Sequence, residues 1–161
     1  MTEKQDWRTI VASSLDWEQA HAKLETAVKG LAAPVRGQRP DGYPHSAWEL
    51  LEHIRITQRD LLDFCQDPDY KEKLEWPHDY WPPTPAPPAA DAWDKSIAEY
   101  RRDRETLARF TTESKIDLTT KIPRGTGQTY LRTILVAVDH ASYHIGQIVS
   151  VRRLLDAWPA A

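Results

Sequence analysis

The placement of the prolines limits most strongly what this chain can fold into. Six of the twelve prolines lie between Pro77 and Pro88, whereas none lies from His45 to Asp67 or from Ala89 to Ile122. Proline inside a helix removes a backbone hydrogen bond and clashes with the preceding turn, so long helices are permitted only in the proline-free windows. Residues 77–88, which we call the proline-rich strap, are therefore expected to be stiff and extended. They could cover one end of a helical bundle, contact a second subunit, or form a plain surface loop.

Capping signals and apolar periodicity predict four helices. In the second, Ser46 and Glu49 have the spacing of a capping box. In the first, Asp16 and Gln19 have the same spacing, and Gly30 lies where a helix would stop. A short helical turn at Trp7 to Val11 precedes the first helix. The expected ranges are about Trp17 to Leu31, Ser46 to Asp67, Asp91 to Thr111, and Tyr130 to Ala157 with a cap at Thr129.

Four amphipathic helices without a strand pattern predict an all-α fold, a four-helix bundle that forms a single domain over residues 1–161. With 161 residues and 40% hydrophobic content, the chain can bury a core without help from metals or disulfides. The connection from Pro68 to Ala90, between the second and third helices, is too long for a tight turn. We therefore expect it to cross over the bundle.

Composition narrows the function classes. A net charge of -3 gives no basic face for nucleic acid. Cys65 is the single cysteine, so no intrachain disulfide can form, and the sequence MTEKQDWRTI lacks the apolar core of a signal peptide. No apolar run approaches the about 20 residues that span a bilayer. We expect a cytoplasmic protein that binds neither nucleic acid nor membrane.

Two histidines stand one helical turn apart in the stretch DHASYHIGQ, residues 139–147. His140 and His144 are offset by about 40° and about 6 Å on a helix, so their rings point the same way and can hold one metal ion. The pair alone is equally compatible with hydrogen-bonded or solvated histidines. Their apolar neighbours place the rings near the core, where imidazoles need partners. His53, which lies among apolar residues of the second helix, is a third candidate ligand.

Other residues are weaker candidates for this site. Gly146 lies inside the expected fourth helix, where glycine costs about 1 kcal/mol relative to alanine. Either something approaches the backbone beside His144, or two helices pack closely there. His21, near the apolar face of the first helix, could neighbour a pocket, whereas His45 and His78 are less favoured as ligands.

The segment SAWELLEHI, residues 46–54, followed by DHASYHIGQIVSVRRLL, residues 139–155, resembles the DinB-like, or YfiT-like, family of metal-dependent hydrolases. The resemblance spans nearly the whole chain. It implies a four-helix bundle of up-down-down-up topology, often a homodimer, with one divalent metal ion held by three histidines. These match His53, His140 and His144. The resemblance also implies chemistry on low-molecular-weight thiols, including isomerisation and S-transfer.

Three neutral imidazoles leave coordination positions open, as in catalytic sites. They suit zinc, nickel, iron(II) or copper, of which we favour zinc or nickel. Such an ion acidifies a bound water molecule or deprotonates a thiol. We therefore expect a hydrolase or thiol S-transferase acting on a small molecule, with Gln147, Tyr143 and Asp139 around the ligands. Asp139 could equally be a surface acid, and Tyr143 could pack between helices. The alternatives are a non-catalytic metal-binding stress-response or interaction module, and an interaction bundle without metal.

Overall fold

The computed structural model describes residues 6–159, and this part of the chain contains three long helices and two short ones. Within these residues there is no strand, so the predicted all-α class is confirmed. None of the helices in this range combines the length and the apolar character that crossing a membrane requires. The helices are α1 (Trp7–Ser14), α2 (Leu24–Val28), α3 (Ala47–Gln66), α4 (Ala92–Glu113) and α5 (Tyr130–Leu154), with 3-10 turns at Ala33–Val35 and His78–Tyr80.

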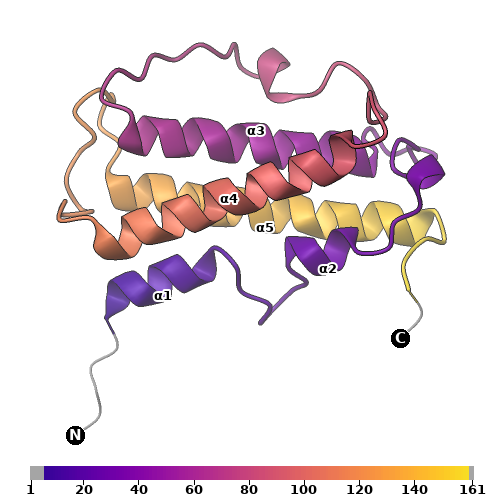
Figure 1. Cartoon of the computed structure of the whole chain (residues 1–161), viewed down its shortest axis with the longest axis horizontal. Helices are drawn as coiled ribbons and strands as arrows, with labels where there is room; N and C mark the ends of the chain where they lie inside the picture. Colours follow the sequence, from indigo (N-terminus) through magenta and orange to yellow (C-terminus); the bar gives the residue numbers. More distant parts are fainter. Residues whose placement is uncertain (1–5, 160–161) are drawn as a thin grey trace, which may run out of the picture.

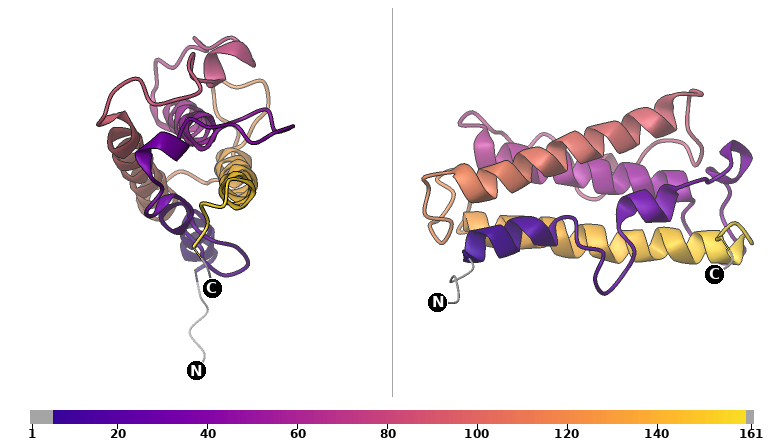
Figure 2. Two further views of the ribbon diagram at one scale, coloured as in Figure 1. Left: turned by 90° about the vertical axis from the view of Figure 1, so that its right-hand side faces the viewer. Right: turned by 60° about the horizontal axis from the view of Figure 1, so that its bottom comes forward.

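The long helices α3, α4 and α5 lie side by side (Figure 1). α3 and α4 run in the same direction, because residues 67–91 return along the outer side of α3 before α4 begins, and α5 runs the opposite way. The short helices α1 and α2 follow one another along the remaining side, where α1 contacts α4 and α2 contacts α5 (Figure 2). We call residues 67–91 the α3–α4 connection; it includes the proline-rich strap.

The predicted capping box at the start of α3 is confirmed. The Ser46 hydroxyl accepts a hydrogen bond from the Glu49 amide at 3.2 Å, and the Glu49 carboxylate accepts one from the Ser46 amide at 2.8 Å. The same Ser46 hydroxyl donates to the carbonyl of Pro85 in the proline-rich strap. The start of α3 and the strap are thus joined through one buried side chain.

Replacing Ser46 by alanine is expected to lower the free energy of unfolding by about 1–2 kcal/mol, because the first-turn amide of α3 and the Pro85 carbonyl both lose a partner. Urea denaturation monitored by circular dichroism measures this change. Ser150→Ala is the matched control, since Ser150 is exposed and donates only within α5. Equal stability of the two variants would show that the cap contributes nothing.

The prediction of one continuous first helix from Trp17 to Leu31 is wrong. Residues 16–23 are not helical, and only α2 lies in that range. The guanidinium of Arg104, which is nearly buried, binds Asp16 at 2.9 Å and Glu25 at 2.8 Å. Residues nine apart would lie on opposite faces of a continuous helix, about 13 Å apart along its axis. One guanidinium could not bind both, so the chain leaves the helix between them. α2 ends at Val28, and Gly30, with φ of 69°, follows the C-cap residue Lys29, close to the stop that the sequence indicates.

The end of α5 also differs from the prediction. Thr129 caps its start, as expected, but the helix ends at Leu154 rather than at Ala157. The buried Arg152 side chain donates to the Ala157 carbonyl at 3.0 Å and 2.9 Å and to the Ala27 carbonyl of α2 at 2.6 Å. Arg152 therefore joins the turn after α5 to α2.

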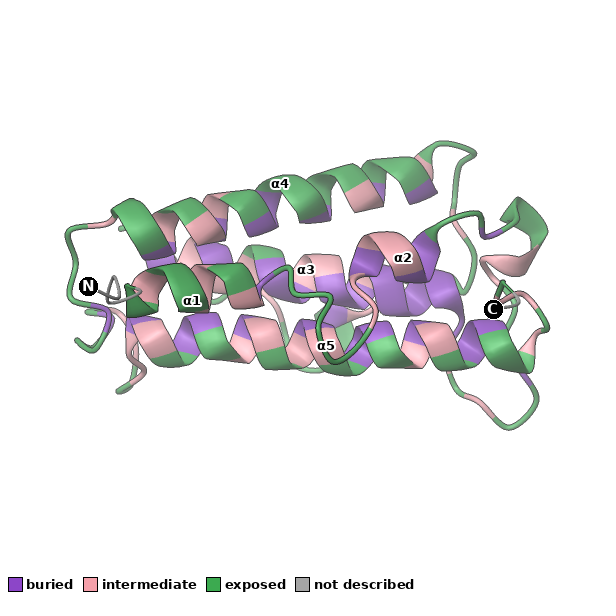
Figure 3. Cartoon of the chain, turned by 90° about the horizontal axis from the view of Figure 1, so that it is seen from below, coloured by how far each residue is buried: buried purple, intermediate pink, exposed green. Residues whose placement is uncertain are grey.

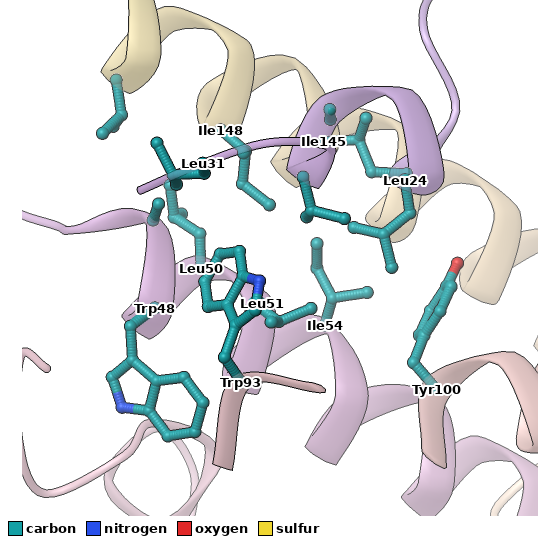
Figure 4. Packing of buried hydrophobic residues seen from close by; sticks show 14 of the residues in the cluster. Leu24, Leu31, Trp48, Leu50, Leu51, Ile54, Trp93, Tyr100, Ile145 and Ile148 are labelled. Atoms are coloured by element: carbon teal, nitrogen blue, oxygen red, sulfur yellow. The ribbon is translucent and has the colours of Figure 1, made fainter. Parts of the chain in front are cut away.

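Buried residues line the inward faces of the helices, whereas the outer faces are exposed (Figure 3). One apolar cluster gathers residues of α2, α3, α4 and α5, including Leu51, Ile54 and Ile148 (Figure 4). A second cluster, which includes Leu62, Leu107 and Ile134, fills the other end. On α5 the first cluster ends at Ala141 and the second ends at Ala137, so His140 lies at their junction.

Candidate metal centre

Three histidines meet between α3 and α5. His53 comes from α3, and His140 and His144 come from successive turns of α5. One ring nitrogen from each lies within 4.8 Å of the other two. The Nε2 atoms of His53 and His140 are 3.0 Å apart. The sequence motif DHASYHIGQ thus lies opposite His53, and the structure brings together the three residues that the sequence predicts as ligands.

Two of the rings have partners that fix their orientation. The Nδ1 atom of His53 donates to the backbone carbonyl of Tyr80 at 2.8 Å. A carbonyl can only accept, so the hydrogen of the neutral His53 ring is on Nδ1 and the lone pair is on Nε2, toward the other histidines. The Nδ1 atom of His144 lies 2.6 Å from the Gln147 side-chain oxygen, which fixes that ring in the same way. Such partners are usual for histidines that bind metals.

An aromatic column covers one side of His53. The Trp81 ring stacks flat on the His53 ring, with centroids 3.9 Å apart and planes 2° from parallel. His45 stacks on Trp81 with centroids 4.1 Å apart. Sequence reasoning missed Tyr80 and Trp81 as part of the site, although both lie in the proline-rich strap. Their aromatic character in that strap is the signal that could have drawn attention to them.

The other residues predicted near the site lie in different surroundings. Tyr143 is 65% exposed, and its ring meets the edge of His144 with centroids 4.9 Å apart. Asp139 is exposed and lines a shallow surface hollow with Leu135. His21 is exposed, with its ring beside the Ala22 carbonyl, and it lines a small cavity whose lining includes none of the three histidines.

Of the two explanations offered for Gly146, close packing of two helices is wrong. The residue is exposed, and a Cβ atom built there would meet nothing within 4 Å. No neighbouring helix of the described chain packs closely enough to require a glycine at this position. Nothing in the structure explains it.

Burial keeps the three histidines neutral. Desolvation and, to a smaller extent, the neighbouring imidazoles lower the pKa of His53 to about 4 and that of His140 to about 3, although the hydrogen bond to the Tyr80 carbonyl acts in the opposite direction on His53. The pKa of His144 is also lowered, chiefly by burial. Neutral rings have a free lone pair each, and two imidazole nitrogens bound to one ion at about 2.0–2.1 Å lie about 3 to 3.4 Å apart. The donor set and the 3.0 Å between the Nε2 atoms of His53 and His140 therefore fit a divalent cation.

The metal-free protein is expected to lose stability as the pH falls below about 6.5. In the unfolded chain these histidines protonate near 6.5, whereas folded His53 and His140 do so only at about 4 and about 3. The unfolded chain therefore binds more protons between these values, and stability falls through that window and levels off below it. Urea denaturation across a pH series measures the decline. His140→Gln should make it shallower, and an unchanged slope would argue against the depressed pKa.

The fold and the site together define a class: an all-α protein with three histidines that could hold a metal ion. A family model described as the DinB superfamily matches residues 16–148, and the chain belongs to this family. The resemblance drawn from the sequence motifs is thereby confirmed. Comparison with curated proteins and comparison with solved structures each found no match.

Proposed function

We propose that this protein binds one divalent metal ion, zinc or nickel, through His53, His140 and His144, and that it is an enzyme acting on a small molecule. The reaction is a metal-dependent hydrolysis or a thiol S-transfer. The observation that carries the proposal is the convergence of three neutral imidazoles between α3 and α5. Three protein ligands leave room for a water molecule or a substrate thiol, as catalytic sites require.

The residues of the chain itself would hold and orient the ligands. The Tyr80 carbonyl and Gln147 fix two rings, and Trp81 covers His53. A bound ion would supply acidification of water or of a thiol. Cys65 is no source of that thiol, because it is 2% exposed and burial raises its pKa to about 12. A thiol in the reaction would therefore be a low-molecular-weight co-substrate.

The proposal extends to the assembly. α1 and α2 together would take the place of the first helix in a four-helix bundle of up-down-down-up topology, with the α3–α4 connection as the crossover. The protein would act in the cytoplasm as a homodimer and would bind neither nucleic acid nor membrane. The net charge of -3 supports the first of these exclusions.

Elemental analysis of the purified protein tests the metal, and activity assays test the reaction. We expect close to one equivalent of zinc or nickel per chain. Glutathione, bacillithiol and mycothiol should each be offered with electrophiles, beside a panel of hydrolysable esters and amides. Turnover should disappear with a chelator and return with the metal. Turnover that survives complete removal of metal would contradict the proposal.

The second candidate is a non-catalytic metal-binding module that acts in a stress response or in an interaction. The limited access to the centre favours it, since His53 is 2% exposed and His144 is 9% exposed. The absorption spectrum of the cobalt-substituted protein separates the two candidates. A change on adding a small thiol indicates an open coordination position and supports the enzyme, whereas a spectrum insensitive to thiols supports the module.

A further inference from the structure

A second polar cluster lies two helical turns from the histidines. Asp60 follows His53 by seven residues on α3, which places it on nearly the same side of the helix and about 10 Å further along. Its two carboxylate oxygens accept from two tyrosines of the α3–α4 connection. Tyr70 donates to Oδ1 at 2.9 Å, and Tyr80 donates to Oδ2 at 2.8 Å. We call Asp60, Tyr70 and Tyr80 the Asp60 clamp.

The hydroxyl groups of the clamp remain donors at any ordinary pH. Burial raises the pKa of both tyrosines, and the hydrogen bonds to Asp60 raise it further. A hydrogen bond from a neutral hydroxyl to a carboxylate is short and roughly twice as strong as one between neutral groups. Two such bonds on one carboxylate hold the connection against α3 at a fixed position.

Tyr80 joins the clamp to the histidines. Its hydroxyl binds Asp60, while its backbone carbonyl accepts from His53 Nδ1 at 2.8 Å. The next residue, Trp81, stacks flat on the same histidine ring. Tyr80 is 7% exposed, so its ring has little freedom to move between these two ends. A shift of the hydroxyl would therefore displace both the carbonyl and the stacked indole.

We propose that Asp60 is a positioning residue for the candidate metal centre. It acts through Tyr80, whose carbonyl keeps the His53 hydrogen on Nδ1 and the lone pair of Nε2 directed at the other two histidines. The link to metal affinity rests on the proposed function, whereas the effect on the His53 ring does not. The competing interpretation is that the clamp only fastens the connection to α3 and contributes to stability alone.

Cobalt(II) titration of the metal-free, full-length protein against a chromophoric chelator tests the link to the metal. Asp60→Asn and Tyr80→Phe should each weaken cobalt binding about 10-fold, the lower end of what loss of an outer partner of a ligand costs. Because both act through one contact, the double variant should bind about as well as either single variant. Asp63→Asn, on α3, is the matched control for Asp60→Asn, and Tyr130→Phe, in the second apolar cluster, is the matched control for Tyr80→Phe. Both control variants should bind cobalt like the wild type.

Nitrogen-15 NMR of the histidine side chains in the metal-free protein tests the position of the His53 hydrogen. In the wild type it should lie on Nδ1, and in both clamp variants the ring should become a mixture of the two neutral forms. If the clamp serves stability alone, the two clamp variants would have a lower melting temperature and unchanged His53 signals. That result would overturn the inference. A changed ring with unchanged cobalt affinity would overturn its link to the metal. A wild type that binds no cobalt would refute the proposed function and leave the NMR result to decide the role of Asp60.

Discussion

Replacement of His53 or His144 by alanine is expected to lower the affinity for zinc or nickel by more than about 100-fold. Loss of an outer partner already costs about 10 to 100-fold, and here a ligand itself disappears. Each histidine supplies one of the three converging nitrogens, and the described part of the chain offers no other histidine, cysteine or carboxylate within that group. Two neutral imidazoles would remain, too few to retain the ion during purification. Elemental analysis and competition with a chelator measure the loss.

His78→Ala is the matched control for these variants. His78 is exposed in the proline-rich strap, where it pairs with Asp79, and it lies outside the group of three histidines. Its removal should leave metal content and affinity unchanged. A metal content equal to that of the wild type in both His53→Ala and His144→Ala would refute the ligand assignment.

The largest expected effect on stability comes from Leu51→Ala. Leu51 is fully buried in the first apolar cluster, and its truncation removes transfer free energy and leaves a cavity between α3 and its neighbours. Losses of about 2–5 kcal/mol are usual for such a change. That is a large share of the about 5–15 kcal/mol that stabilises a typical domain.

Leu135→Ala is the control, because the same atoms are removed from a side chain that is 47% exposed on α5. Its effect should stay within about 0.5 kcal/mol. Urea denaturation of the metal-free proteins separates this packing effect from any stabilisation by bound metal. Similar losses at the two positions would contradict the burial that the structure gives to Leu51.

The long helices could be predicted because their limits are local. The capping box of Ser46 and Glu49, the cap at Thr129 and the proline-free windows each act within a few residues, and α3, α4 and α5 begin where these signals place them. The first helix could not be predicted in the same way. Its interruption depends on Arg104 of α4, which lies far away in the sequence and binds two carboxylates at once.

In the candidate site, too, the features set by local sequence could be predicted, and those set by distant segments could not. The spacing of His140 and His144 on one helix, and the apolar surroundings of His53, are visible in the sequence and led to the group that the structure brings together. The residues that orient His53 come from the α3–α4 connection, which has no regular period. No pattern could show that the Tyr80 carbonyl and the Trp81 ring reach His53. The same reasoning offered close helix packing as a reason for Gly146, and its exposed position contradicts that reason.

The buried Arg152 side chain has a consequence for shortening the chain. Its guanidinium has no carboxylate beside it among the described residues and relies on the carbonyls of Ala27 and Ala157, which lie near opposite ends of the sequence. A version that stops before Ala157 would leave this cation with fewer acceptors in an apolar setting, a costly arrangement. The hydrogen bond from Arg152 to the Ala27 carbonyl of α2 would then weaken, although no residue of α2 had been altered. The point at which the protein can be trimmed is thus set by the Arg152 side chain of α5, which needs the Ala157 carbonyl as an acceptor.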